Sequence, residues 1–205
     1  MKKTPVLKIN PNKPDKKVIR YGAKVIKKGG LVAFPTETVY GIAANLLKEK
    51  ALDKLYRVKR RPRSKPFTVH IADLGSIKDM GCRIEEETKA LIDEFWPGPL
   101  TIILRSENGT KIGFRMPYSK VALDLIKAAK VPVVAPSANI SGKHPPKSAA
   151  EVLSQLDGKI DLLIDSGRTK VGVESTVVDL TVRPFKVLRE GAIKKETISK
   201  ALSRE

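Results

Sequence analysis

The sequence predicts an α/β fold, in which helices pack on a β-sheet. Three observations support this prediction. Apolar segments of strand length alternate with amphipathic segments of helix length along most of the chain. Several expected strands, such as Thr176–Leu180, show no clean polar alternation, which is typical of strands buried on both faces. The 205 residues, 41% of them apolar, suffice for one domain with a sizeable core.

Helices are predicted where apolar residues recur near every 3.6 positions. Val18, Ile19, Val25 and Ile26 follow this period between residues 15 and 28, and a pair of glycines directly afterwards can end the helix. The same pattern predicts the remaining helices, over Glu49–Arg60, Glu86–Phe95, Lys120–Lys130, Ser148–Leu156 and Lys194–Leu202.

Strands are predicted from short apolar runs bounded by proline, glycine or polar residues. The first, Leu31–Phe34, is stopped by Pro35. Residues 1–14 contain four lysines and three prolines, so we expect an extended basic arm there and a single domain over residues 15–205. The other strands are expected at Phe67–Ala72, Leu100–Leu104, Pro132–Ala135, Leu162–Asp165, Thr176–Leu180 and Lys186–Arg189.

Several classes of protein are disfavoured by what the sequence lacks. It has one cysteine, Cys82, and two histidines, so we expect no disulfide framework and assign no metal ligands. The apolar runs are far shorter than the ~18 residues of a membrane span, and the N-terminus does not have the pattern of a signal peptide. We therefore expect a cytoplasmic protein with no membrane contact. P-loop, dinucleotide-binding and nucleophile-elbow motifs are also missing.

Basic charge is concentrated in the first third of the chain. The net charge is +18, and residues 1–65 carry 19 basic and 4 acidic side chains. Such a field attracts phosphate-bearing partners, either nucleotides or RNA. Lysine-rich surfaces also occur in proteins that bind no polyanion, so the overall charge alone does not decide between these interpretations.

The densest basic cluster lies between Arg57 and Lys65, where six of nine residues are basic. Pro62 disfavours a helical conformation for Arg61. If the chain is extended here, Lys59 and Arg61 share a face and point into one pocket, where two cations can bind a triphosphate. The other interpretation is a solvated charge run at a helix end, and composition leaves both open.

Polar side chains also follow several expected strands, at the positions where ligands collect in α/β sheets. These segments are 34–41, 136–142 and 172–179, and they supply hydroxyls, an amide and carboxylates. Ordinary turn or strand chemistry explains each segment equally when it is taken alone. His70 lies inside an expected strand, where a structural, hydrogen-bonded histidine is the commoner case.

Taken together and in order, eight motifs resemble the YrdC-like threonylcarbamoyl-adenylate synthases. The resemblance runs from about residue 15 to residue 195. It implies a twisted mixed α/β sheet with flanking helices around a large basic cavity. The motifs are Pro35-Thr36-Glu37-Thr38-Val39-Tyr40-Gly41, Lys59-x-Arg61-Pro62, Pro66 to His70, Trp96-Pro97-Gly98-Pro99-Leu100-Thr101, Arg115-x-Pro117, Ser137-Ala138-Asn139-x-Ser141-Gly142, Glu174-Ser175-Thr176-Val177-Val178-Asp179 and Leu188-Arg189-x-Gly191.

The resemblance also implies roles for individual residues. The family pattern K-x-R…S-x-N falls on four residues that would be catalytic and bind ATP: Lys59, Arg61, Ser137 and Asn139. Lys65 and Arg189 would join them at ATP. Four residues would surround the threonine substrate: Thr38, His70, Arg115 and Ser175.

This chain departs from the family pattern at four of these motifs. Arg60 stands where glycine is frequent, and Lys65 stands where an asparagine near ATP is usual. Ser119 replaces a common histidine, and Ser166 replaces the middle residue of a D-G-G motif.

The resemblance implies a nucleotidyltransferase that makes threonylcarbamoyl-adenylate and pyrophosphate from L-threonine, bicarbonate and ATP. The product would pass to a separate threonylcarbamoyl-transferase acting on tRNA. Magnesium would arrive with ATP, because the sequence has no clear carboxylate cluster to hold it. The alternative is a basic RNA-binding module without catalysis, and direct contact with tRNA or another RNA is compatible with both interpretations.

Overall fold

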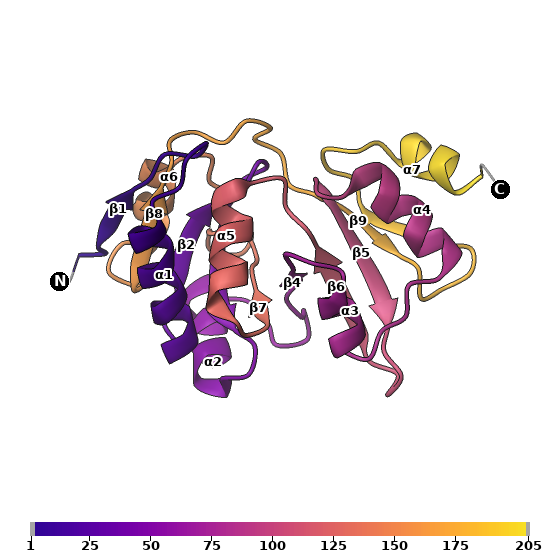
Figure 1. Ribbon diagram of the computed structural model, residues 1–205, viewed down its shortest axis with the longest axis horizontal. Coiled ribbons are helices and arrows are strands. Elements are labelled where there is room, and N and C mark those ends of the chain that lie inside the picture. The colour runs from indigo at the N-terminus through magenta and orange to yellow at the C-terminus, as the bar shows by residue number, and fades with distance from the viewer. Residues whose placement is uncertain (1–2, 204–205) are drawn as a thin grey trace.

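A twisted mixed β-sheet runs through the molecule, described by a computed structural model over residues 3–203 (Figure 1). The strand order is β1-β8-β2-β3-β7-β4-β6-β5-β9-β10. The predicted α/β fold class is therefore confirmed. The strands are β1 Val6–Lys8, β2 Val32–Pro35, β3 Tyr40–Asn45, β4 Val69–His70, β5 Leu100–Arg105, β6 Lys111–Arg115, β7 Val133–Val134, β8 Leu162–Asp165, β9 Thr176–Asp179 and β10 Lys186–Arg189. The helices are α1 Lys16–Lys28, α2 Glu49–Lys59, α3 Gly75–Asp79, α4 Glu86–Phe95, α5 Lys120–Ala129, α6 Ala149–Leu156 and α7 Lys195–Leu202.

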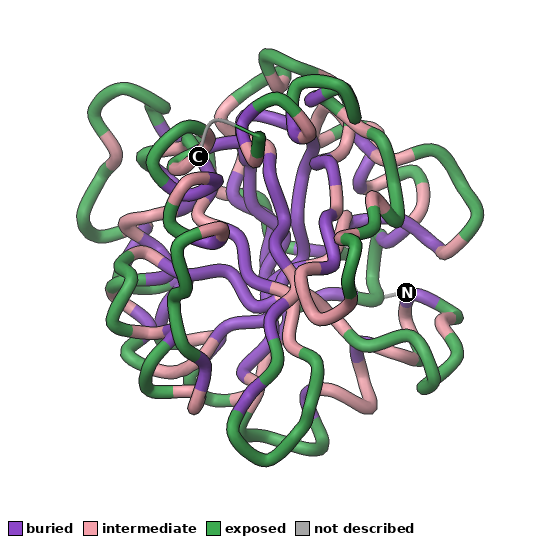
Figure 2. The backbone as a smooth tube through the Cα atoms, turned by 90° about the vertical axis from the view of Figure 1, so that its right-hand side faces the viewer, coloured by how far each residue is buried: buried purple, intermediate pink, exposed green. Residues whose placement is uncertain are grey.

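Two apolar clusters cover opposite faces of the first half of the sheet. Consecutive residues of one strand alternate between them: Phe34 of β2 packs with α1 and α5, whereas Ala33 faces the other cluster. This alternation is the period-2 geometry of a strand buried on both faces, and it explains why these segments lack polar alternation in sequence. Figure 2 shows the buried strands at the centre and the exposed loops around them.

Most predicted helices form within one or two residues of the expected bounds. α1 begins after Asp15, whose side chain accepts a hydrogen bond from the Lys17 amide, and ends at Gly29, which has φ 95°. The positive φ suits glycine, so the glycine pair does end this helix.

Four elements were not predicted: β1, β3, β6 and α3. β3 is a buried strand that begins at Tyr40, at the end of the polar segment 34–41, and continues to Asn45. β6 pairs antiparallel with β5, and α3 has only five residues. The five residues of α3 are too few for a periodic helical signal.

The N-terminal stretch that was expected to be an extended arm contributes to the sheet. Val6–Lys8 forms β1, which pairs in parallel with β8 at the edge. Residues 1–2 of that arm and 204–205 of the expected domain lie outside the described residues. The domain boundary at residue 15 stays a prediction.

The middle of the sheet is narrow, and we call this part the waist. β7 and β4 have two residues each, and β4 pairs with β7 on one side and β6 on the other. The waist joins a half containing β1, β8, β2 and β3 to a half containing β6, β5, β9 and β10. Within residues 3–203, no helix has both the length and the apolar character that crossing a bilayer requires.

Candidate active site

A cavity opens where the two halves of the sheet meet at the waist. The cavity and its mouth enclose about 590 Å³. Three arginines and one carboxylate line it: Arg61, Arg115, Arg189 and Glu174. The remaining polar lining comes from the side chains of Thr36, Thr68, His70, Thr101, Ser137 and Ser175. A cavity with this balance of charge and hydroxyls suits an anionic ligand.

Arg115 is held rigidly in the cavity wall. One of its terminal nitrogens, Nη2, donates to Glu37 Oε1 at 2.8 Å and to Thr38 Oγ1 at 2.8 Å. Its Nε donates to the carbonyl of Gly98 at 3.3 Å. Both side chains of the ion pair with Glu37 are buried, 6% and 7% exposed, so this charge-assisted contact is shielded from water. These hydrogen bonds fix the orientation of the Arg115 guanidinium, and Arg115 also lines the cavity.

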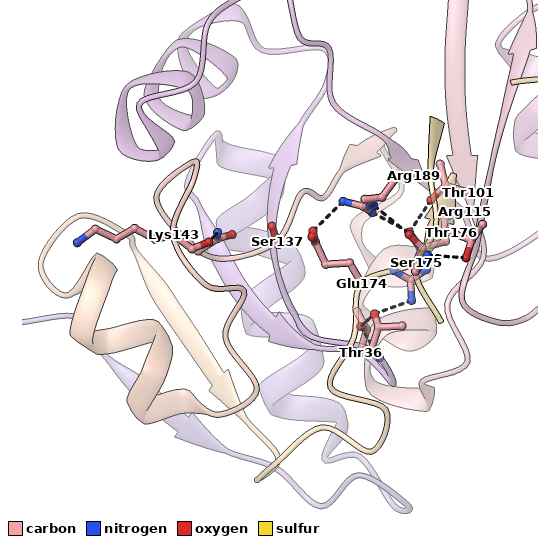
Figure 3. Close-up of polar contacts among 12 residues, drawn as sticks. Thr36, Thr101, Arg115, Ser137, Lys143, Glu174, Ser175, Thr176 and Arg189 are labelled. Carbon is pink, nitrogen blue, oxygen red and sulfur yellow. Dashed lines mark hydrogen bonds and ion pairs between the residues drawn. The ribbon is translucent and has the colours of Figure 1, made fainter. Parts of the chain in front are cut away.

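A second polar network joins the beginning of β9 to the end of β10 (Figure 3). The Ser175 hydroxyl is 2.9 Å from the Thr101 hydroxyl and accepts from Arg189 Nη2 at 3.2 Å. Arg189 also forms an ion pair with Glu174 at 2.9 Å. Gly191 allows this approach, because a Cβ there would lie 2.2 Å from the Glu174 carbonyl.

The chain is helical at Lys59, as predicted, so the extended conformation that would place Lys59 and Arg61 on one face does not form. Helix α2 continues to Lys59, and Arg60 then takes a left-handed conformation with φ 50°. Lys59 is 1% exposed, and its ammonium lies beneath the loop after β7, donating to the carbonyls of Ser137 and Asn139 and, at 3.4 Å, to Asn139 Oδ1. Only Arg61 of the two cations lines the cavity.

Burial gives the Lys59 ammonium an unusual pKa. Loss of water around the charge, followed by the nearby positive charge of Arg61, lowers the pKa from 10.5 to about 8. Lys59 and Asn139 thus shape the loop that presents Ser137, which lines the cavity. The Asn139 amide completes this loop by donating to the carbonyl of Lys143 at 2.6 Å, and the Lys143 side chain itself points away from the cavity (Figure 3).

Arg61 reaches the cavity from a short exposed loop. Its Nε donates to the Lys65 carbonyl at 2.8 Å and its Nη2 to the Pro66 carbonyl at 3.0 Å. The guanidinium carbon lies 5.3 Å from the centre of the Phe67 ring, a cation–π geometry. Phe67 in turn stacks on Tyr56 with ring centres 4.3 Å apart. The Lys65 side chain is exposed and does not line the cavity.

The four residues expected around threonine take different positions. Arg115, Ser175 and His70 line the cavity. Thr38 is fully buried behind it, with its hydroxyl oxygen bound to Arg115. Thr36, Thr101 and Glu174 line the cavity but were not assigned, although each lies in one of the quoted motifs. Sequence alone gave no reason to prefer Thr36 over Thr38, since the two are neighbours in one loop.

His70 is the buried titratable group of the cavity. Burial, and then the positive charge of Arg115, lowers the pKa of the imidazole from 6.5 to about 3. Its Nδ1 has no partner among residues 3–203. The neutral ring can accept or donate one hydrogen bond there, but it is not a cation at neutral pH.

No metal site is formed by the described part of the chain. Residues 3–203 contain no group of three or more histidine, cysteine, aspartate or glutamate side chains placed to hold an ion.

The fold and cavity define an α/β protein with an arginine-lined pocket at the centre of its sheet. Residues 24–191 match the family of Sua5, YciO and YrdC proteins, described as telomere recombination. The chain belongs to this family.

Relatives with assigned names support the match. The chain is 45% identical to the threonylcarbamoyl-AMP synthase of Pyrococcus abyssi, over 90% of this chain and 57% of that protein. It is 42% identical to the threonylcarbamoyl-AMP synthase of Bacillus subtilis, over 88% of this chain and 55% of that protein. The chain therefore spans little more than half the length of these two relatives.

A solved structure shares the fold almost throughout. Pyrococcus abyssi Sua5 complexed with L-threonine superposes with a TM-score of 0.92 at 41% identity, covering 98% of this chain and 61% of that chain. The twisted mixed sheet with flanking helices, expected from the family resemblance, is confirmed.

The low pKa of His70 predicts an acid-sensitive fold. Between about pH 6.5 and pH 3 only the unfolded chain takes up a proton at this residue, so stability falls as pH falls. Between pH 7 and pH 5, the native chain should lose about 2 kcal/mol more unfolding free energy than His70→Gln. Urea denaturation of both proteins at each pH measures this, and equal losses would contradict the assignment.

The buried position of Lys59 predicts a stability effect that Arg61 lacks. Lys59→Met leaves the buried Asn139 carbonyl without its donor and removes one of two donors to the Ser137 carbonyl, which should lower the unfolding free energy by about 1–3 kcal/mol. Arg61→Met frees only carbonyls of exposed residues and should change it by less than about 0.5 kcal/mol. Urea denaturation at pH 7 compares the two, and equal effects would show that Lys59 does not support the loop.

Proposed function

We propose that this chain catalyses the formation of threonylcarbamoyl-adenylate and pyrophosphate from L-threonine, bicarbonate and ATP. The observation that carries this proposal is the cavity itself, which brings Arg61, Arg115 and Arg189 together with the Ser137 and Ser175 hydroxyls. The names of its relatives and the threonine complex of the 41%-identical structure support the same reaction.

In the proposed reaction, the threonine amine attacks the bicarbonate carbon and water is lost, giving a carbamate. A carbamate oxygen then attacks the α-phosphorus of ATP, and the bond to the β-phosphate oxygen breaks to release pyrophosphate. Such chemistry depends on positioning and on stabilising negative charge, more than on a protein nucleophile. The preorganised arginines of the cavity suit this requirement.

We assign the ATP end to one side of the cavity. Arg61 and Ser137 would contact the phosphates directly, with Arg189 near the opposite wall. Lys59 and Asn139 would act by shaping the loop that carries Ser137, because both are buried beneath it. Lys65 would reach ATP only if its exposed loop moved, so its role is the least supported of the set.

We assign threonine to the side formed by Arg115, Ser175 and His70. The fixed guanidinium of Arg115 matches the two oxygens of a carboxylate. The Ser175 hydroxyl or the neutral His70 ring would bond the β-hydroxyl. Thr38 would act through Arg115, whose orientation it holds at 2.8 Å.

Magnesium would be supplied with ATP as part of the substrate. Among residues 3–203, Glu174 is the one carboxylate that lines the cavity, and it is paired with Arg189. One paired carboxylate suits a magnesium ion that keeps its phosphate and water ligands.

The product would be used in tRNA modification by a separate threonylcarbamoyl-transferase, and this role would place the chain in the cytoplasm. The basic side chains concentrated in residues 1–65 suit contact with tRNA or with an acidic face of the transferase.

The test is release of pyrophosphate that depends on ATP, bicarbonate and threonine together. Activity should fall about a hundred- to a thousandfold in Arg61→Ala, because a preorganised charge contact is removed. Arg83→Ala, an exposed arginine distant in sequence from every cavity motif, is the matched control and should keep full activity. RNA binding without amino-acid-dependent pyrophosphate release would instead favour the binding-module interpretation.

The same assay predicts an order of amino-acid substrates, with threonine best, serine poorer and valine poorest. Serine lacks only the methyl group, a loss of about 1–3 kcal/mol. Valine keeps the shape but leaves the hydrogen-bonding group of the site unpaired, which discriminates more strongly. Equal rates with valine and threonine would contradict a site that recognises the hydroxyl.

A further inference from the structure

A second cavity lies beyond the carboxyl ends of three parallel strands, and we call it the strand-end cavity. With its mouth it encloses about 1230 Å³, more than the candidate active site. β1, β8 and β2 run in parallel, and residues at or beyond the end of each strand line this cavity. They are Pro11 and Asn12 after β1, Ser166, Arg168 and Thr169 after β8, and Pro35, Thr36 and Glu37 at the end of β2. In open α/β sheets this edge is where ligands bind.

One end of the strand-end cavity is suited to a carboxylate. Helix α5 begins there, and its first two amides, those of Lys120 and Val121, have no acceptor among residues 3–203. The positive end of the helix dipole faces the same region. Lys120, Arg168 and Lys170 add side-chain cations to the lining, and Asp124 adds a carboxylate. Lys120 pairs with Asp124 at 3.4 Å and Arg168 with Glu151 at 3.6 Å, so the two free amides and Lys170 are the groups left for a carboxylate.

The other end is suited to an ammonium group. Glu37 lines this cavity and is 8% exposed, and its Oε1 is occupied by Arg115. Its Oε2 is buried and has no hydrogen-bond partner among the described residues. A buried carboxylate oxygen without a donor is costly, so this atom calls for a donor from outside the chain. Thr169 Oγ1, also in the lining, is buried without a partner as well.

The walls between these ends are largely apolar. Pro35, Pro97 and Leu123 contribute to them, and the exposed Tyr118 stands at the rim. A ligand of this cavity therefore carries separate negative and positive groups on a small apolar body.

We propose that the strand-end cavity is a second ligand site that binds a free α-amino acid with an aliphatic side chain. Its carboxylate meets the first turn of α5, and its ammonium donates to Glu37 Oε2. The proposed threonine site lies in the other cavity, which Arg115 lines, whereas Glu37 lines this one; Thr36 lines both. The second site does not depend on the proposed catalytic function.

The chain offers a matched pair of variants at this site. Ser119 caps α5 and donates to the Pro35 carbonyl at 3.2 Å, and it stands where the resembling family commonly has histidine. Ser119→His places a larger ring in the cavity, whereas Ser119→Ala removes the same hydroxyl and leaves the cavity open. Leu123→Trp fills the cavity from the next turn of the helix, should the histidine variant not fold.

The experiment is a titration of the full chain, followed by amide chemical shifts in two-dimensional NMR. The three probes share one side chain: L-leucine, 4-methylpentanoate without the ammonium, and 3-methylbutylamine without the carboxylate. Leucine should shift the amides of Lys120, Val121 and residues 166–170, and each truncated probe should bind at least about tenfold more weakly, a difference of 1.4 kcal/mol.

The variants and probes decide the proposal without any turnover assay. Ser119→His or Leu123→Trp should abolish the leucine shifts, and Ser119→Ala should retain them. Equal affinity for leucine and 4-methylpentanoate would overturn the proposal, because Glu37 would then contribute nothing. Shifts that are missing in the native chain, or that persist in the filled variants, would overturn it as well. Pyrophosphate release is measured in a separate assay. The NMR titration can therefore be interpreted even if the proposed synthase reaction is not observed.

Discussion

The buried ion pair between Arg115 and Glu37 is the contact on which the site depends. Arg115 ends β6 in one half of the sheet, and Glu37 follows β2 in the other. A guanidinium that is 6% exposed is stable only when its donors are satisfied, and here Glu37, Thr38 and Gly98 supply the acceptors. The geometry of the cavity wall therefore follows from one set of hydrogen bonds that links both halves.

Burial also separates the residues that line the cavity from the residues behind its wall. Lys59 and Thr38 are fully buried and do not line the cavity, whereas Arg61, Ser137 and Ser175 do. Both kinds are needed, because an exposed guanidinium without a rigid frame loses the preorganisation that stabilises developing charge. The low pKa values of Lys59 and His70 are the consequence of placing such groups in a dry interior.

Sequence patterns predicted the α/β class, most helices and the segments that form the cavity, because each depends on local periodicity or on a motif. They did not predict which of two neighbours faces the cavity. Lys59 and Arg61 separate because Lys59 is the last residue of α2 and Arg60 then turns left-handed. Thr36 lines the cavity and Thr38 lies behind its wall, because β6 places Arg115 beside Thr38. This is a long-range contact that no local pattern encodes. The roles of these residues in catalysis stay predictions.

The two-residue width of the waist has a mechanical consequence. Few backbone hydrogen bonds cross β7 and β4, so we expect the waist to deform more easily than the long pairing of β5 with β6. The cavity lies across it, with Ser137 on one side and Thr101 and Ser175 on the other. A ligand that contacts both walls links the two halves of the sheet across the waist. Its binding free energy then adds to the stability of the folded chain. Filling the cavity is therefore expected to stiffen the sheet at the waist.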